Sequence, residues 1–360
     1  MSIEPKVNIA VIGGGAVGII QMTLYREHPQ AQVVVLAETA EERGRATAAA
    51  QGVPEWVGDY RGLLAREDIH VFSIALPNHL HVPVALAALR AGKHVFLEKP
   101  MATNAADATM LMEEARRCGR RLMVGQNNRF TPEVQTARQL IERGVLGDLY
   151  HAKTAWTRRA GIPRIGSWFT QRKFAGGGCC YDIGVHALDR CLYLMGEFEA
   201  ASVSGQTYAQ LGPRGQGGGT WGKGDVDPAA VFDVDDLAVA LIKLRSGRTV
   251  LLEASWAAHQ AEADFNGTHL FGTAGGLQFP PLRLFTPGTH GYREERVDCT
   301  SPYVNPNRMA HFVDVVLGRA EPFIKLEESV AVQRILDAIY VSSKSGREVR
   351  LDAAPAAVAS

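Results

Sequence analysis

The sequence predicts two parts of different fold class: an α/β domain with a doubly wound parallel sheet, followed by an α+β domain with an open, mostly antiparallel sheet. Three observations support this prediction. The first 125 residues alternate short apolar runs with helical patterns, three glycines directly follow the first run, and beyond Pro132 the apolar runs become longer and half-polar. We therefore expect a first domain over residues 1–125 and a second over residues 126–360.

The apolar runs of the first part have the length of buried strands. They predict strands at residues 7–12, 32–37, 71–75, 95–97 and 122–124. Helical patterns lie between them at residues 41–51, 81–91 and 104–118. Strands that alternate with helices form βαβ units, and such units build a parallel sheet.

The second part predicts fewer helices and a hairpin. Strands at residues 236–244 and 249–256 flank the turn Arg245-Ser246-Gly247, and weaker strand signals follow at residues 270–271 and 282–285. Helices are expected at residues 133–143, 182–195, 307–317 and 327–343, and the glycine-rich and proline-rich stretch 212–228 is expected to be a surface loop. We expect the helices to cover one face of the sheet, with the C-terminal helix able to pack back on the first domain.

Composition limits the possible partners. The 360 residues contain 38 Lys+Arg and 38 Asp+Glu, so a net charge of zero provides no field for nucleic acid or an anionic membrane. The chain has no apolar stretch of about 20 residues, and its first residues carry no signal-peptide pattern. The five cysteines are odd in number and lack the paired spacing of a zinc site. These features predict a cytoplasmic protein with a small substrate and free thiols.

The glycine cluster fits the dinucleotide-binding pattern G-x-G-x-x-G at Gly13, Gly15 and Gly18. The first glycine allows the tight turn, the second lets the backbone approach a pyrophosphate, and the third lets the helix pack on the strand. Ala16 and Val17 then begin a helix whose N-terminal amides face the phosphates. The cluster follows a strand and opens a helix, so it predicts a Rossmann fold with a bound dinucleotide.

Glu38 stands at the end of the second predicted strand, about 20 residues beyond the glycines. A carboxylate there accepts hydrogen bonds from the ribose diol and repels a 2′-phosphate. Thr39 follows it rather than an arginine. The cofactor is therefore predicted to be NAD, with NADP disfavoured.

Glu98-Lys99-Pro100 follows a buried strand. Ligands of open α/β sheets bind outside the carboxyl ends of the strands, where a lysine can transfer protons. The alternative for Lys99 is a structural ion pair with Glu98, and spacing alone leaves both open.

A second cluster follows the glycines 176–178. Asp182 and His186 are four residues apart and share one face of a predicted helix. A histidine on such a helix is often a core or surface residue, but an aspartate beside it and the glycine run favour a functional role.

Taken together, these motifs resemble the glucose–fructose oxidoreductase/inositol dehydrogenase (Gfo/Idh/MocA) family. The matching stretches are Gly13–Gly18, Ala75–His81, Glu98–Pro100, Gly125–Pro132 and Gly176–Asp189. The resemblance implies that Lys99, Asp182 and His186 are catalytic. It also implies that Pro77 and Asn78 lie near the nicotinamide. Both the resemblance and the uncovered face of an open sheet indicate a homo-oligomer assembled through the second domain, and we expect a dimer or tetramer, although neither observation gives the number of subunits.

Further site residues are assigned within these motifs and near them. His81, Glu98 and Lys99 join the predicted cofactor site. The predicted substrate site comprises Lys99, Asn127, Arg129, Trp168, Arg172, Asp182 and His186. No metal is expected, because His79 and His81 form only a weak ligand pattern and hydride transfer needs none.

The resulting prediction is an NAD-dependent dehydrogenase that oxidises a ring hydroxyl of a sugar, inositol or related polyol. Two alternatives stay open. One is a glycosidase or lyase that oxidises its sugar transiently and regenerates its own NAD; the other is a sensor or repressor that binds nucleotide without turnover. The presence of Lys99, Asp182 and His186 together, and the lack of a basic patch, argue against the sensor.

Overall fold

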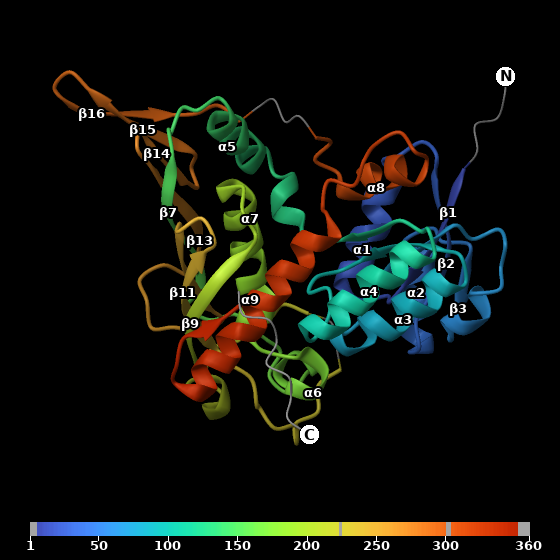
Figure 1. Cartoon of the computed structure of the whole chain (residues 1–360). Helices are drawn as coiled ribbons and strands as arrows, with labels where there is room; N and C mark the ends of the chain where they lie inside the picture. Colours follow the sequence, from blue (N-terminus) through green and yellow to red (C-terminus); the bar gives the residue numbers. More distant parts are fainter. Residues whose placement is uncertain (1–5, 223–224, 300–303, 352–360) are drawn as a thin grey trace, which may run out of the picture.

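The computed structural model describes residues 6–222, 225–299 and 304–351. The first residues considered for a signal peptide, and residues 223–224 of the glycine-rich stretch, lie outside these ranges. Figure 1 shows two bodies side by side, the first in blue to cyan and the second in green to orange, with the red helix α9 between them.

The first body contains the predicted parallel sheet. Its strands are β1 (Val7–Ile12), β2 (Ala31–Ala37), β3 (Glu55–Val57), β4 (Val71–Ile74), β5 (His94–Leu97) and β6 (Leu122–Val124). They lie in the order β3-β2-β1-β4-β5-β6, and every pair is parallel. The doubly wound α/β prediction is confirmed. The short strand β3, which is half-buried along its length, was missed because three residues carry too weak a pattern.

The helices of this body connect its strands: α1 (Ala16–Tyr25), α2 (Glu41–Ala50), α3 (His81–Arg90) and α4 (Ala105–Arg117). Helix α4 begins after Asn104, whose side chain accepts a hydrogen bond from the Asp107 amide. Such a cap satisfies one of the amides that a helix leaves without a partner at its start. The start of α4 is therefore fixed, which matters for the site described below.

The second body is built on a sheet of nine strands within the described residues. These are β7 (Leu149–Arg158), β9 (Ala200–Tyr208), β11 (Leu237–Leu244), β12 (Thr249–Ser255), β13 (Asp264–Gly272), β14 (Gly276–Phe279), β15 (Arg283–Gly288), β16 (Gly291–Arg296) and β17 (Val349–Arg350). Their order is β16-β15-β14-β13-β7-β12-β11-β9-β17, with a parallel pair β7–β12 and antiparallel neighbours elsewhere. The predicted hairpin is the pair β11–β12, so the mostly antiparallel prediction is confirmed.

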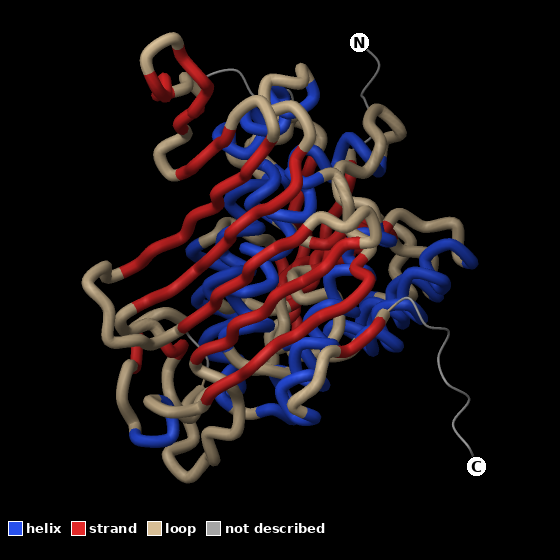
Figure 2. Tube along the Cα trace, turned by 60° about the vertical axis from the view of Figure 1, so that its left-hand side comes forward, coloured by secondary structure: helices blue, strands red, loops and turns tan. Residues whose placement is uncertain are grey.

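Helices cover one face of this sheet and leave the other open (Figure 2). They are α5 (Pro132–Glu142), the short α6 (Arg172–Ala175), α7 (Val185–Met195) and α9 (Leu326–Ser345). One turn of π-helix (Cys180–Gly184) leads into α7, where the sequence predicted regular helix from Asp182. Part of the predicted surface loop pairs as β10 (Gly218–Gly219) with β8 (Ile162–Pro163).

The C-terminal part of the chain returns to the first body. Helix α8 (Arg308–Val316) packs there, with Phe312 edge-on to Phe96 at 5.6 Å between ring centroids. Helix α9 contacts both α4 of the first body and β9 of the second. Among the described residues, the helices are too short or too polar to cross a membrane.

Candidate active site

The glycine turn after β1 forms an open cradle. A Cβ atom on Gly13 would lie 2.3 Å from the Ala75 carbonyl oxygen, and one on Gly18 would lie 1.9 Å from the Gly13 carbonyl oxygen. Both positions require glycine for packing. A Cβ on Gly15 would meet nothing within 4 Å, and no side chain caps the start of α1, where Ala16 and Val17 lie. The turn therefore leaves space and free amides for a phosphate group.

Glu38, at the end of β2, is held beside this cradle. Its carboxylate accepts hydrogen bonds from the amides of Gly14 (2.9 Å) and Ala40 (3.0 Å) and from Arg43 (2.8 Å). Burial alone would raise the pKa of Glu38, but these hydrogen bonds together lower it below its ordinary value. The carboxylate is charged and fixed, as an acceptor for a ribose diol must be. These residues fit a dinucleotide.

The loop after β4 belongs to the first body and contacts the second. Asn78 donates a hydrogen bond from Nδ2 to the Ala175 carbonyl at 2.8 Å. His81 is fully buried, and its two ring nitrogens contact the carbonyl oxygens of Pro100 (2.8 Å) and Leu76 (2.9 Å). The prediction that His81 touches the cofactor does not fit this placement. Its ring joins the loops that follow β4 and β5.

Lys99 extends from the end of β5 to the second body. Its Nζ donates to the backbone oxygen of Asp182 at 2.8 Å and lies 3.0 Å from the Asp182 carboxylate. The structural alternative, a pair between Lys99 and Glu98, is not what the structure shows. Glu98 instead accepts a hydrogen bond from Gln21 (2.9 Å) and lies 3.8 Å from Arg308 of α8.

The turn that carries Asp182 is formed around a buried carboxylate. Asp235 accepts hydrogen bonds from the amides of Gly178 (2.7 Å) and Cys180 (2.9 Å) and from the Tyr340 hydroxyl (2.5 Å). A Cβ on Gly178 would lie 1.9 Å from the Asp235 carbonyl oxygen. The glycine run thus admits the close approach of another chain segment rather than a ligand. A π-helical turn at such a place is a frequent feature of functional sites.

Asp182 is oriented from both sides. The indole of Trp256, which is fully buried, donates to one carboxylate oxygen at 2.9 Å, and Lys99 contacts the other. Both oxygens are therefore satisfied, and the carboxylate cannot turn without losing a partner.

His186 lies one turn further, on α7, with its ring 5.5 Å from that of Trp156. Burial lowers the pKa of His186 well below its ordinary value, and the charges of Lys99, Arg190 and other nearby cations lower it further. Its Nδ1 is buried without a hydrogen-bond partner. A neutral imidazole is able to accept a proton.

These groups share one cavity of about 960 Å³. The predicted residues that line it are Gly13, Gly15, Ala16, Val17, Glu38, Pro77, Asn78, Glu98, Lys99, Asn127, Trp168, Asp182 and His186. Gly18 lies behind the cradle, in the packing role that the motif assigns to it. The structure thus joins the glycine cradle to the Lys99–Asp182 pair within one space.

Two predicted substrate ligands lie outside the cavity. Arg129 is fully buried and binds Asp189 (2.8 Å from Nε) and Glu328, so its charge is used in the core. Arg172 is exposed and donates from Nε to the Asp233 carbonyl at 3.3 Å. The prediction that these arginines bind substrate does not fit their positions.

Other residues at the cavity were not among the predicted ligands. Trp156 and Arg158 line it from the end of β7, and Asp264 accepts a hydrogen bond from each (3.0 and 3.2 Å). Trp221 comes from the glycine-rich stretch and packs edge-on to Phe169. The sequence signal that could have identified Trp221 is an aromatic residue within a glycine-rich stretch.

The comparisons with known proteins agree with this geometry. The model of the GFO/IDH/MocA oxidoreductases, a family with an NAD-binding Rossmann fold, matches residues 7–126, and that of the GFO/IDH/MocA C-terminal domain matches residues 134–278. The chain belongs to this family. It is accordingly an oxidoreductase with an NAD-binding domain, as the resemblance implied.

Several relatives act on sugars according to their names. Levoglucosan dehydrogenase of Pseudarthrobacter phenanthrenivorans is 32% identical over 76% of this chain and 73% of its own. D-glucoside 3-dehydrogenase of Escherichia coli is 28% identical over 95% of this chain and 97% of its own. A protein of Amycolatopsis mediterranei is 37% identical over 75% of this chain and 74% of its own. It carries the provisional name UDP-kanosamine synthase oxidoreductase subunit.

Solved structures show the same architecture. A levoglucosan dehydrogenase in complex with NADH has a TM-score of 0.83 at 25% identity, covering 96% of this chain and 99% of its own. An oxidoreductase domain protein from Kribbella flavida has a TM-score of 0.85 at 26% identity, covering 97% and 100%.

Proposed function

We propose that this protein is an NAD-dependent dehydrogenase that oxidises a ring hydroxyl of an uncharged sugar, inositol or related polyol. One observation carries the proposal. Lys99 from the first body is held on Asp182 of the second, beside His186, in the cavity that continues into the glycine cradle. A hydroxyl group at this place can lose its proton to a protein group while its carbon faces the cofactor site.

In this proposal NAD, when bound, supplies the hydride acceptor. His186, which lines the cavity and whose lowered pKa leaves it neutral near pH 7, accepts the hydroxyl proton. Lys99 donates a hydrogen bond to the same substrate oxygen. Asp182 holds Lys99 in place and is itself held by Trp256.

The charges at this end of the cavity support an uncharged substrate. Each cation there has a carboxylate beside it: Lys99 with Asp182, Arg158 with Asp264, and Arg308 with Glu98. A phosphate or carboxylate on the substrate that bound Lys99 or Arg158 would have to displace the carboxylate already there. The names of the relatives, which refer to a glucoside and to levoglucosan, support a carbohydrate.

Glu38 supports a preference for NAD over NADP. Its charge faces the position of a 2′-phosphate, and Arg43, the nearest cation, is already bound to it. The kcat/KM values for the two cofactors test this preference, in the wild type and in Glu38→Ala. A wild-type enzyme that prefers NADP would contradict it.

A substrate panel tests the reaction itself. The purified protein with NAD is offered D-glucose, methyl β-D-glucoside, levoglucosan, myo-inositol and D-glucuronate, and NADH is followed by absorbance. We expect turnover of at least one uncharged compound, little with D-glucuronate, and a rate about 10²–10⁴-fold lower in Lys99→Met. Conversion without accumulation of NADH would show the redox-cycling alternative, and no conversion of any compound would contradict the proposal.

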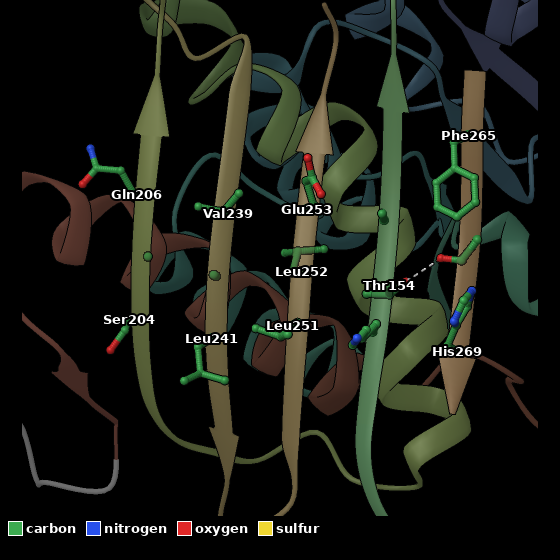
Figure 3. Close-up of a pocket in the computed structure, with 15 residues that line it drawn as sticks. Thr154, Ser204, Gln206, Val239, Leu241, Leu251, Leu252, Glu253, Phe265 and His269 are labelled. Carbon is green, nitrogen blue, oxygen red and sulfur yellow. Dashed lines mark hydrogen bonds between the residues drawn. The ribbon is translucent and has the colours of Figure 1, made fainter. Parts of the chain in front are cut away.

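We also propose that the open face of the second sheet joins two copies of this chain. Figure 3 shows this face, where Val239, Leu241, Leu251 and Phe265 point away from the helices. Leu251 is 41% exposed, and the hollow of about 670 Å³ on this face is also lined by Lys153 and Glu253. Such a face can pair with itself about a twofold axis. Sedimentation of wild type and Leu251→Glu tests it, with a monomeric wild type as the contrary result.

A further inference from the structure

One stripe of helix α9 faces the catalytic turn. Gln333, Asp337 and Tyr340 occupy positions i, i+4 and i+7, which share a face of a helix. Tyr340 reaches the turn through Asp235, as described above. Asp337 and Gln333 reach Tyr181, the residue directly before Asp182.

Asp337 joins two segments that are far apart in the sequence. One of its carboxylate oxygens accepts the Tyr181 hydroxyl at 2.5 Å, and the other accepts the amide of Ala105, at the start of α4, at 2.7 Å. Burial and the nearby Asp337 charge raise the pKa of Tyr181 well above its ordinary value, so the phenol stays protonated and donates. Gln333 completes the contact by donating to the phenol oxygen at 2.8 Å.

The segment from Lys99 to Ala105 is thereby fixed at both ends. At one end, Lys99 contacts Asp182. At the other, Ala105 is bound to Asp337, and the Thr103 carbonyl lies 3.2 Å from the Tyr181 hydroxyl. Between these ends, residues 101 and 102 are almost fully buried. The segment that carries the lysine and the turn that carries the aspartate are thus tied to one carboxylate of α9.

We propose that Asp337, acting through Tyr181 and the start of α4, is a positioning residue that sets the placement of Lys99 against Asp182. This proposal rests on the proposed function, since it assumes that the Lys99–Asp182 pair contacts the substrate. Asp337 itself does not line the cavity. Its effect must therefore appear in the turnover of correctly folded sites rather than in cofactor binding.

Two variants break the link at different points. Asp337→Asn has one acceptor oxygen for three donors, the Tyr181 hydroxyl, the Gln333 side-chain amide and the Ala105 amide, so at least one contact is lost. Tyr181→Phe removes the hydroxyl and leaves Asp337 on Ala105. Asp337→Glu restores both acceptors. Glu327→Gln is the matched control, because Glu327 pairs with Arg116 between the same two helices, α9 and α4, at the exposed surface.

The measurement is kcat per NADH-binding site, using levoglucosan or another sugar turned over in the panel. Sites are counted by NADH fluorescence titration. We expect Asp337→Asn and Tyr181→Phe each to lower kcat per site about 10- to 100-fold, with NADH affinity changed less than about 3-fold. The double variant should lose little more than the worse single variant, because both act through one link. Asp337→Glu should recover part of the loss, and Glu327→Gln should match the wild type.

The contrary outcomes are distinct. If both variants retain wild-type kcat per site while Lys99→Met is inactive, the positioning proposal fails and the proposed function stands. The same holds if the variants only reduce the number of NADH-binding sites, since that is a structural effect. If the wild type converts no compound of the panel, the proposed function itself fails. If Lys99→Met retains wild-type kcat, Lys99 is not part of the mechanism, and the positioning proposal fails with it.

Discussion

The glycine cradle of the first body and the catalytic turn of the second face the same cavity but are constructed differently. The cradle is fixed mostly by contacts within the first strand–helix–strand unit: Gly18 packs on Gly13, and Glu38 binds the amide of Gly14, 24 residues away. A more distant partner of the cradle is the Ala75 carbonyl, which packs against Gly13. The turn at residues 178–186 is fixed by distant partners, Asp235 at a separation of 57 residues and Trp256 at 74. Cofactor binding should therefore survive changes that stop the chemistry, whereas the chemistry depends on most of the chain.

The largest expected effect is at Lys99, where a substitution should slow the chemistry and leave cofactor binding intact. Lys99→Met should lower kcat by about 10²–10⁴-fold, the range typical of a lost proton-transfer or hydrogen-bonding group, while NADH affinity stays within about 3-fold of the wild type. Sugar-dependent NADH formation and NADH fluorescence titration measure the two quantities. Near-normal kcat would remove Lys99 from the mechanism, and a collapse of NADH binding would show that the cradle depends on the second body.

The same contrast explains how much the sequence predicted. The cradle was predicted residue by residue, because the G-x-G-x-x-G spacing and the acidic residue after β2 specify backbone geometry locally. Asp182 and His186 were predicted by type and spacing. The π-helical turn, the Asp235 centre and the Trp256 contact were not, since they depend on which distant segments meet there.

Contacts with other chain segments also explain why two predicted ligands, Arg129 and His81, do not face the cavity. Arg129 lies in a stretch that resembles the family, yet its partners Asp189 and Glu328 are 60 and 199 residues away and enclose its charge in the core. His81 is likewise enclosed by two carbonyl groups. Motif spacing identifies polar residues near a site, but only the fold decides which of them face the cavity.

The second prediction concerns proton transfer at His186. His186→Asn keeps approximate shape and hydrogen-bonding capacity but cannot titrate, so kcat/KM for the sugar should fall about 10²-fold with NADH affinity unchanged. Turnover of His186→Asn at the wild-type rate would show that this histidine has only a packing role.

The lowered pKa of His186 also predicts how kcat/KM and stability change with pH. The pKa of His186 is lowered, so the imidazole is neutral at pH 7, and the loss of wild-type kcat/KM on acidification should begin below the ordinary histidine value of about 6.5. Between that value and the folded-state pKa, the unfolded chain binds a proton that the folded chain does not, so stability also falls as the pH falls. Both dependences should weaken in His186→Asn. An acidic limb at or above pH 6.5 in the wild type would contradict the burial argument.

The third prediction tests the cradle at two glycines to which the motif assigns different roles. Gly15→Ala meets open space, so the protein should fold normally but bind NADH about 10-fold more weakly, because the methyl group occupies space for the pyrophosphate. Gly18→Ala places a methyl group on the Gly13 carbonyl and should lower the free energy of unfolding by about 1–3 kcal/mol or more. Thermal unfolding without ligand and NADH titration separate the two effects. Equal thermal stability of the two variants would contradict this division of roles.

The smallest expected effect compares two tryptophans, one serving each region. Trp256 donates to the Asp182 carboxylate, and Trp56 donates to the backbone oxygen of Glu38 at 3.0 Å. Trp256→Phe removes a buried hydrogen bond to a carboxylate that orients Lys99, so kcat/KM for the sugar should fall about 3- to 10-fold with NADH affinity unchanged. Trp56→Phe should leave sugar turnover at saturating NAD unchanged and weaken NADH binding at most about 3-fold, because the Glu38 side chain keeps its bonds to Gly14 and Ala40. If both variants instead change the kcat/KM for the sugar and the NADH affinity to the same extent, the catalytic turn and the cradle depend on each other, and the independence argued here is wrong.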